Sequence, residues 1–240
     1  MFPISDLNPT RRIPYVTYGL ILVNVLVFIG QSGLSQRQLF NIFINQSIVP
    51  VLVVRDPFSL ETLLDFIRSM FFHGGWAHLI SNMVYLAIFG DNIEDRFGKV
   101  VYVLFYFACG FAAGITQILI APDSRVPMVG ASGAIAGVLG AYLLMFPGVR
   151  VRGLVFWGIF PFTADVPAIF VLGFWFITQL FNGFLSLGVD TMSGGVAFFA
   201  HIGGFVAGMA LTGLLMLIVP QPPAEQRRRW VYERYGRYDY

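Results

Sequence analysis

The sequence predicts an all-α polytopic membrane protein, a single domain built as a bundle of six transmembrane helices. Hydrophobic residues make up 57% of the 240 residues and charged residues only 12%, and the mean hydropathy is +0.73. Soluble domains are about half apolar and about a quarter charged, so this composition excludes a water-soluble domain. Six helices of about 20 residues use roughly half of the chain and leave room for one long loop and a short tail.

Six apolar runs, with proline or glycine at many of their ends, are expected to span the bilayer. They are 14–33, 76–90, 100–121, 132–146, 167–185 and 196–219. The first run follows two arginines, as signal peptides do, but no small-residue cleavage site follows it, so we expect a retained helix. The long loop, 34–75, is too polar to span and apolar enough to lie partly embedded in the membrane interface as short amphipathic pieces. No segment is predicted to form a sheet.

The basic residues indicate the topology of these runs. If the N-terminus is cytoplasmic, the inner segments hold eleven of the fifteen Lys and Arg residues: Arg11, Arg12, Arg96, Lys99, Arg150, Arg152, Arg227, Arg228, Arg229, Arg234 and Arg237. This positive-inside bias places both termini in the cytoplasm. We therefore expect a cytoplasmic arm at 1–13, a membrane domain at 14–219 and a basic cytoplasmic tail at 220–240. The tail could bind nucleic acid or anionic lipid, but a topology anchor is favoured.

Polar residues gather at the outer ends of three predicted helices. Ser132 begins the fourth run, His201 lies near the start of the sixth, and His78 and Asn82 lie in the second. The fourth run rises about 22 Å, short of the roughly 30 Å hydrocarbon core, so Ser132 should lie below the outer surface. His201 should lie about 7.5 Å below its outer end. The two residues are therefore expected at one depth, facing the protein interior or a wet cavity.

This layer of residues predicts nucleophilic chemistry. Small residues at four-residue spacing let two helices pack closely enough for Ser132 and His201 to meet. A neutral imidazole can then take the hydroxyl proton as the oxygen attacks a carbonyl. His78 and Asn82, four residues apart, can point to one place and, with the free N–H groups of the helix start, meet the developing negative charge. No intramembrane Asp or Glu offers a third member, so a dyad is favoured.

Other interpretations of these residues remain. Each could simply pack or hydrogen-bond between helices. Zinc would need the three histidines His73, His78 and His201, but the first two are about 140° apart on a helix and no HExxH motif is present. A lipase-type G-x-S-x-G elbow is excluded because its last position is Ala134 and no strand is predicted before the serine.

Four motifs in order, together with six runs, resemble the rhomboid family of intramembrane serine proteases, in its six-span prokaryotic form. The motifs are His73-x4-His78-x3-Asn82, Gly90-Asp91-Asn92-Ile93-Glu94-Asp95-Arg96-Phe97-Gly98, Gly130-Ala131-Ser132-Gly133, and Ala200-His201-Ile202-Gly203-Gly204 followed by Gly208.

The resemblance implies that Ser132 is the nucleophile and His201 the base, with His78 and Asn82 stabilising the oxyanion and Glu94 in a structural role. It implies transmembrane-helix substrates in the lipid bilayer, no cofactor, no metal and no nucleic acid. It also implies the inner membrane of a prokaryotic cell, with the active site open to the outer face. One position departs from many relatives, which carry a tyrosine that packs on the imidazole where this chain has Ala136. Tyr142 or a phenylalanine could take its place.

Two other functions remain open. One is a catalytically silent rhomboid-like protein that binds transmembrane clients, although such relatives typically lack the serine or the histidine. The other is a small transporter, which would need polar residues along a path through the membrane, whereas here they cluster near one face.

Overall fold

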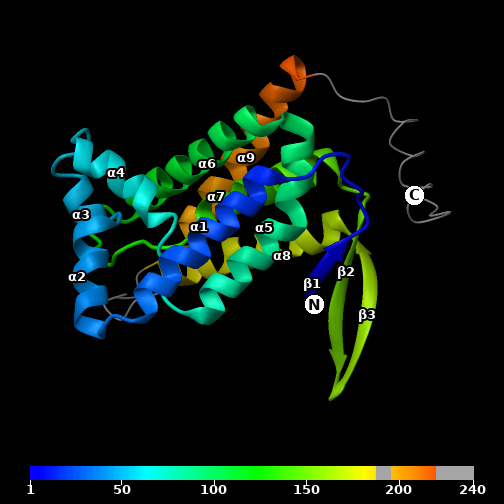
Figure 1. The fold of residues 1–240 in the computed structure, drawn as a ribbon, viewed down its shortest axis with the longest axis horizontal. Helices are drawn as coiled ribbons and strands as arrows, with labels where there is room; N and C mark the ends of the chain where they lie inside the picture. The colour runs from blue at the N-terminus through cyan, green and yellow to red at the C-terminus, as the bar shows by residue number, and fades with distance from the viewer. Residues whose placement is uncertain (188–195, 220–240) are drawn as a thin grey trace.

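The computed structural model describes residues 1–187 and 196–219, and within them the chain forms nine helices and three strands. In chain order they are β1 (Phe2–Asp6), α1 (Tyr15–Ser32), α2 (Gln36–Gln46), α3 (Pro50–Val53), α4 (Leu60–Ser69), α5 (Trp76–Phe97), α6 (Lys99–Ile120), α7 (Ser132–Met145), β2 (Arg150–Trp157), β3 (Phe160–Pro167), α8 (Ala168–Ser186) and α9 (Phe198–Ile218). Figure 1 shows a helical bundle with α2, α3 and α4 at one end, here called the loop end, and the strands at the other, the sheet end.

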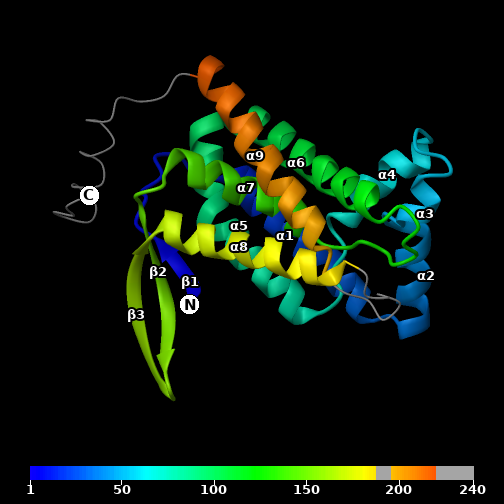
Figure 2. The ribbon, with the colours of Figure 1, turned by 180° about the vertical axis from the view of Figure 1, so that it is seen from behind.

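The short helix α7 lies at the centre of the bundle, in contact with α5, α6, α8 and α9. Its 14 residues are apolar on every side, and residues 134–142 are all buried. A helix without a polar face is stable only when it is covered all round, and the neighbouring helices provide that cover. The short, buried fourth helix that the sequence predicted is therefore present. Figure 2 shows α8 and α9 along the opposite face of the molecule, next to α7.

Four of the described helices are long and apolar enough to cross a membrane: α1, α6, α8 and α9. They coincide with four of the six predicted runs. The prediction of six spans is not confirmed, because α7 is too short and α5 carries charged residues in its last two turns. The sequence placed the end of the second run at residue 90, but the helix continues to Phe97, and Gly98 at φ +74 ends it. Polar residues lower hydropathy without breaking a helix.

A small antiparallel sheet corrects the all-α prediction. Its strand order is β1-β2-β3, and β2 and β3 form a hairpin in which Trp157 pairs with Phe160. The intervening Gly158 has φ +62, as a two-residue hairpin turn requires. Residues 150–167 were expected to form an inner loop, yet they alternate in the manner of strands: Val151 is buried against the bundle, while Arg152 lies on the other face beside Asp165. In both ribbon views the hairpin projects beyond the helices.

Glu94 of α5 fixes the start of α1 at the sheet end. Its carboxylate accepts hydrogen bonds from the backbone N–H groups of Val16 (3.0 Å) and Thr17 (2.8 Å) and from the Thr17 hydroxyl (2.9 Å). Pro14, the residue before the helix, supplies no side-chain cap. A distant carboxylate therefore satisfies the backbone donors that a helix start leaves free.

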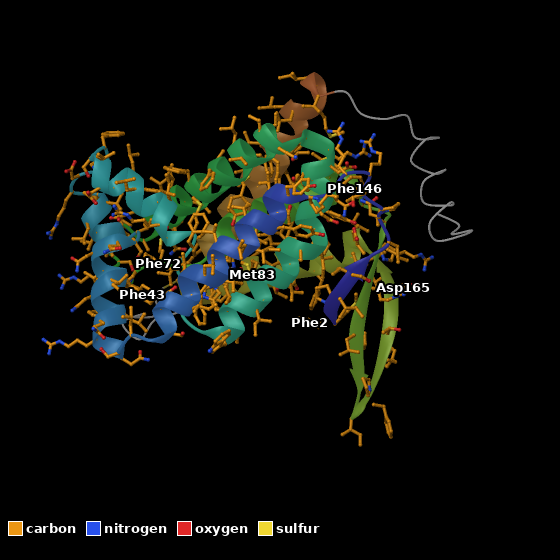
Figure 3. The ribbon with its side chains drawn as sticks, in the orientation of Figure 1. Phe2, Phe43, Phe72, Met83, Phe146 and Asp165 are labelled. Carbon is orange, nitrogen blue, oxygen red and sulfur yellow. The ribbon has the colours of Figure 1, made fainter. Side chains whose placement is uncertain are left out.

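The long first loop folds at the loop end into three short helices. Ser35 and Gln38 form a reciprocal capping box at the start of α2. Phe66 of α4 stacks on Phe111 of α6, with ring centroids 4.8 Å apart, and so fastens the loop to the bundle. Phe43 and Phe72, labelled at the loop end in Figure 3, also pack together, far from Asp165 at the sheet end.

Candidate active site

Glycines bring α7 and α9 into backbone contact. A Cβ atom at Gly204 of α9 would overlap the carbonyl oxygen of Gly133, and one at Gly208 would overlap that of Gly137. Likewise, a Cβ at Gly140 of α7 would overlap the carbonyl oxygen of Phe205. Only glycine allows so close an approach, and the small-residue spacing predicted this contact. The first turns of α7 and α9 are thereby held side by side.

Ser132 and His201 meet at this contact. Ser132 is the first residue of α7, and His201 lies in the first turn of α9. The Ser132 Oγ atom lies 2.8 Å from His201 Nε2, within hydrogen-bond range. The two side chains come from the starts of two neighbouring helices. An imidazole nitrogen at this distance is placed to take the hydroxyl proton.

The other side of the imidazole contacts α8. His201 Nδ1 lies 2.8 Å from Oε1 of Gln179, and the Trp175 ring lies 5.9 Å from the imidazole between centroids, at 34°. The sequence did not predict either residue. Tyr142, which it offered as support for the ring, is instead at the sheet end, where its hydroxyl donates to the Asp6 carboxylate. That suggestion was therefore wrong.

Gly130 lies between the side chains of His78 and Ser132. Gly130, with φ +129, has its N–H bonded to the Ser69 carbonyl at 2.8 Å. A Cβ at Gly130 would lie 2.7 Å from His78 Nε2 and 3.6 Å from Ser132 Oγ. Glycine is therefore needed at position 130, because the positive φ favours it and a Cβ there would collide with the His78 ring.

Asn82 lies one turn after His78 on α5. Its side chain is buried, and its amide nitrogen has no hydrogen-bond partner within residues 1–187 and 196–219. Buried amides are nearly always paired, so an unpaired donor in this part of the fold is available for a ligand. The first-turn N–H groups of α7, which have no intrahelical acceptor, provide further donors next to Ser132.

His73, in the turn before α5, packs its ring against His78, with centroids 5.1 Å apart. The Gln31 amide brackets the backbone of His73, donating to its carbonyl (3.1 Å) and accepting from its N–H (3.2 Å). Burial, and to a smaller extent the neighbouring His78, lowers the pKa of His73 to about 4. His73 is therefore neutral near pH 7 and supports the turn that leads into α5. Among the described residues, no three His, Cys, Asp or Glu side chains are grouped so as to hold a metal.

The motif at residues 90–98 lies away from Ser132, at the sheet end. A Cβ at Gly90 would collide with the Tyr102 hydroxyl, Gly98 forms the turn between α5 and α6, and Glu94 holds the start of α1. This motif therefore joins α1, α5 and α6, and the reactive groups come from α5, α7, α8 and α9.

Fold and site together define a polytopic helical membrane protein in which a serine and a histidine are in contact at the starts of two closely packed helices. Residues 60–218 match the family model of the Rhomboid domain. The chain belongs to the Rhomboid family.

Several proteins of Arabidopsis thaliana are similar to this chain. RHOMBOID-like protein 6, mitochondrial, is 34% identical over 162 residues, which are 68% of this chain and 46% of that protein. RHOMBOID-like protein 7 is 34% identical over 155 residues, 65% of this chain and 43% of that protein. Rhomboid-like protein 11, chloroplastic, is 26% identical over 128 residues, 53% of this chain and 41% of that protein. The chain thus spans less than half the length of these relatives.

Proposed function

We propose that this protein is a serine-type endopeptidase that hydrolyses peptide bonds in or near the transmembrane helices of other membrane proteins. The observation that carries the proposal is the 2.8 Å contact between Ser132 Oγ and His201 Nε2. Membership of the Rhomboid family supports it, because serine proteolysis is the family's general activity. No cofactor takes part in this chemistry.

The mechanism follows from the placement of these groups. His201 Nε2 takes the Ser132 proton as Oγ attacks the substrate carbonyl, and the protonated imidazole then gives that proton to the leaving amine. His201 next takes a proton from the water that attacks the acyl-serine, and returns it to Ser132 Oγ as the acyl–Oγ bond breaks and the second product leaves. His78, Asn82 and the first-turn N–H groups of α7 stabilise the oxyanion. Each such donor is usually worth about 3 to 4 kcal/mol.

The substrate must unwind before it is cut. A regular helix shields each carbonyl with a hydrogen bond from the N–H four residues later, so Ser132 can reach only a locally opened segment. Small or helix-breaking residues are therefore expected near the cleavage site. Ser132 lies at the end of α7 that is nearer α2–α4, below the surface of the bilayer, where water reaches it more readily than at the bilayer centre.

Charge gives the proposed orientation. Arg11, Arg96 and Arg152 belong to segments at the sheet end, which the positive-inside rule places in the cytoplasm. The loop end, with the site, then faces the outside of the cell, and the inner membrane of a prokaryote is the proposed location. The basic tail at 220–240, part of the same argument, lies outside the described residues.

Co-expression with tagged single-span reporter proteins tests the function. The wild type should cut at least one reporter of a panel, and Ser132→Ala and His201→Ala should not. Ser186→Ala is the matched control, because its hydroxyl, at the end of α8, bonds only to the Gly183 carbonyl among the described residues. A fluorophosphonate probe should label the wild type and leave Ser132→Ala unlabelled.

The result can also favour the alternative. A wild type that cuts no reporter and takes up no probe, yet is recovered bound to a transmembrane client, would be a catalytically silent binder. Equal cutting by Ser132→Ala would exclude the serine mechanism.

A further inference from the structure

Gln179 is a buried amide in a largely apolar membrane helix. It lies on α8, and its side chain points at His201, with Oε1 2.8 Å from Nδ1. A polar group in hydrocarbon is costly unless it is hydrogen-bonded, so such residues usually pair with another polar group. Here the other group is the imidazole that contacts Ser132.

The hydrogen bonds of Gln179 fix which way its amide faces. The Nε2 group donates to the Trp175 carbonyl (3.4 Å) and to the Thr178 hydroxyl (3.3 Å), both on its own helix. Because the amide nitrogen has these two acceptors, the amide oxygen is the atom that faces His201. An oxygen is only an acceptor, so it can pair with Nδ1 of His201 only when Nδ1 carries the proton.

The position of that proton decides what the imidazole can do. A neutral imidazole with its proton on Nδ1 has a free lone pair on Nε2, which lies 2.8 Å from Ser132 Oγ. The other tautomer has a proton on Nε2 and cannot accept the serine proton. An acceptor at Nδ1 also stabilises the imidazolium that forms during acylation, as the carboxylate does in a Ser-His-Asp triad.

We propose that Gln179 is a positioning residue that holds His201 in the Nδ1-protonated tautomer and orients its ring toward Ser132. This inference rests on the proposed function and extends it: the site is a line of three side chains, Ser132, His201 and Gln179, with a neutral amide at the third position. Trp175, one turn earlier on α8, lies against the same ring and keeps it in the plane that this line needs.

Kinetics of three variants test the proposal on the full-length protein. Gln179→Leu keeps the volume and removes the acceptor, so kcat for reporter cleavage should fall at least about tenfold, in the range seen when a ligand-orienting partner is removed, with KM nearly unchanged. Asn182→Leu makes the same amide-to-leucine change at an exposed position of the same helix, and its kcat should equal that of the wild type.

Gln179→Glu separates orientation from simple packing. It restores an acceptor at the same place, so its kcat should exceed that of Gln179→Leu. A carboxylate favours the imidazolium, so the acid limb of its pH profile should move to higher pH. His78 is the same in both proteins, so the movement reports on His201 and the carboxyl introduced beside it. If the glutamine were merely structural, Gln179→Glu would have no higher kcat than Gln179→Leu.

The tautomer can be read without proteolysis. In protein labelled with ¹⁵N-histidine, the His201 signals are those that vanish in His201→Ala, and in the wild type they should show the proton on Nδ1. In Gln179→Leu the tautomers should mix. A wild-type proton on Nε2, or full kcat in Gln179→Leu, would overturn the proposal. If the wild type neither cuts reporters nor takes up the fluorophosphonate, it is the proposed function that fails, and the tautomer signals alone decide the role of Gln179.

Discussion

A substitution at Gly204, one turn after His201, tests whether the close contact between α7 and α9 sets the distance between Ser132 and His201. A methyl group there would overlap the carbonyl oxygen of Gly133, the residue next to Ser132. Cβ atoms in real structures essentially never approach closer than 3.0 Å, and the obstacle is backbone, which cannot rotate away. In Gly204→Ala the two helices must therefore separate at the site itself.

The size of the effect follows from the geometry. Relieving the overlap requires a displacement of about 1 Å, which stretches the 2.8 Å contact between Ser132 and His201 to about 3.8 Å, beyond hydrogen-bond range. A misplacement of about 1 Å in a catalytic pair can cost about 100-fold in rate, and overpacking costs about 1 to 3 kcal/mol of stability. We expect kcat to fall about 100-fold in Gly204→Ala at a temperature where the protein is still folded.

Gly213→Ala is the matched control on the same helix, because a Cβ there meets no atom within 4 Å. It should leave kcat unchanged and raise the unfolding temperature slightly, since alanine favours a helix over glycine by about 1 kcal/mol. Reporter cleavage and thermal unfolding in detergent measure both quantities. Full kcat in Gly204→Ala would refute the argument that glycine contact sets the distance between serine and histidine.

Two further predictions concern stability. Glu94→Gln removes the carboxylate that accepts three hydrogen bonds at the start of α1, so the free energy of unfolding should fall by about 1 to 3 kcal/mol. Asp165→Asn, in a partly exposed ion pair with Arg152, should cost less than about 1 kcal/mol. Thermal unfolding compares the two variants, and equal losses would contradict the capping role of Glu94. The second prediction concerns pH. The pKa of His73 in the folded protein is about 4, below the ordinary 6.5, so the unfolded chain binds more protons than the folded one between these values. The stability that His73 contributes is therefore present above pH 6.5 and is lost as the pH falls toward 4. At about 1.4 kcal/mol per pH unit, this loss of stability amounts to about 3 kcal/mol, so the wild type should lose more stability than His73→Phe between pH 6.5 and 4. Equal dependence of the unfolding free energy on pH in the two proteins would exclude His73 as the cause.

The membrane helices could be predicted from the sequence because hydropathy acts over long runs. The expected run 100–121 is observed as Lys99–Ile120, and 167–185 as Ala168–Ser186. A helix in lipid must be apolar along its length, so its position is recorded locally in the sequence. Hydropathy did not predict the last two turns of α5, because these turns contain charged residues.

The sheet was missed although part of its signal was present. Val151, Gly153 and Val155 alternate with Arg150 and Arg152, and Gly158 marks a tight turn, but the basic residues led to an inner loop. The pairing of β1 with β2 could not be predicted from a local pattern, because it joins Phe2 to Leu154, which are far apart in the sequence. Only the folded chain brings these segments together.

In the candidate site, too, the sequence predicted some residues and missed others. Ser132 and His201 could be paired in advance because helix length and glycine spacing fix depth and approach. The distance rule could also have excluded Tyr142, which lies about 15 Å along the helix from Ser132. Gln179 could not be assigned from its sequence context, because its partner depends on how α8 is rotated against α9. Nothing in the sequence distinguishes Gln179 from the exposed amide Asn182 on the same helix.

The helix α8 has one further consequence. It lies at the edge of the bundle and exposes a row of large apolar side chains: Phe170, Phe174, Ile177, Phe181 and Phe184. Its other side holds Trp175 and Gln179 against His201. Any outward displacement of α8, whether by lipid or by an arriving helix, would withdraw both from the imidazole in one movement. His201 would then lose its Nδ1 partner until α8 returned, so the proposed protease would be slower whenever its edge is open.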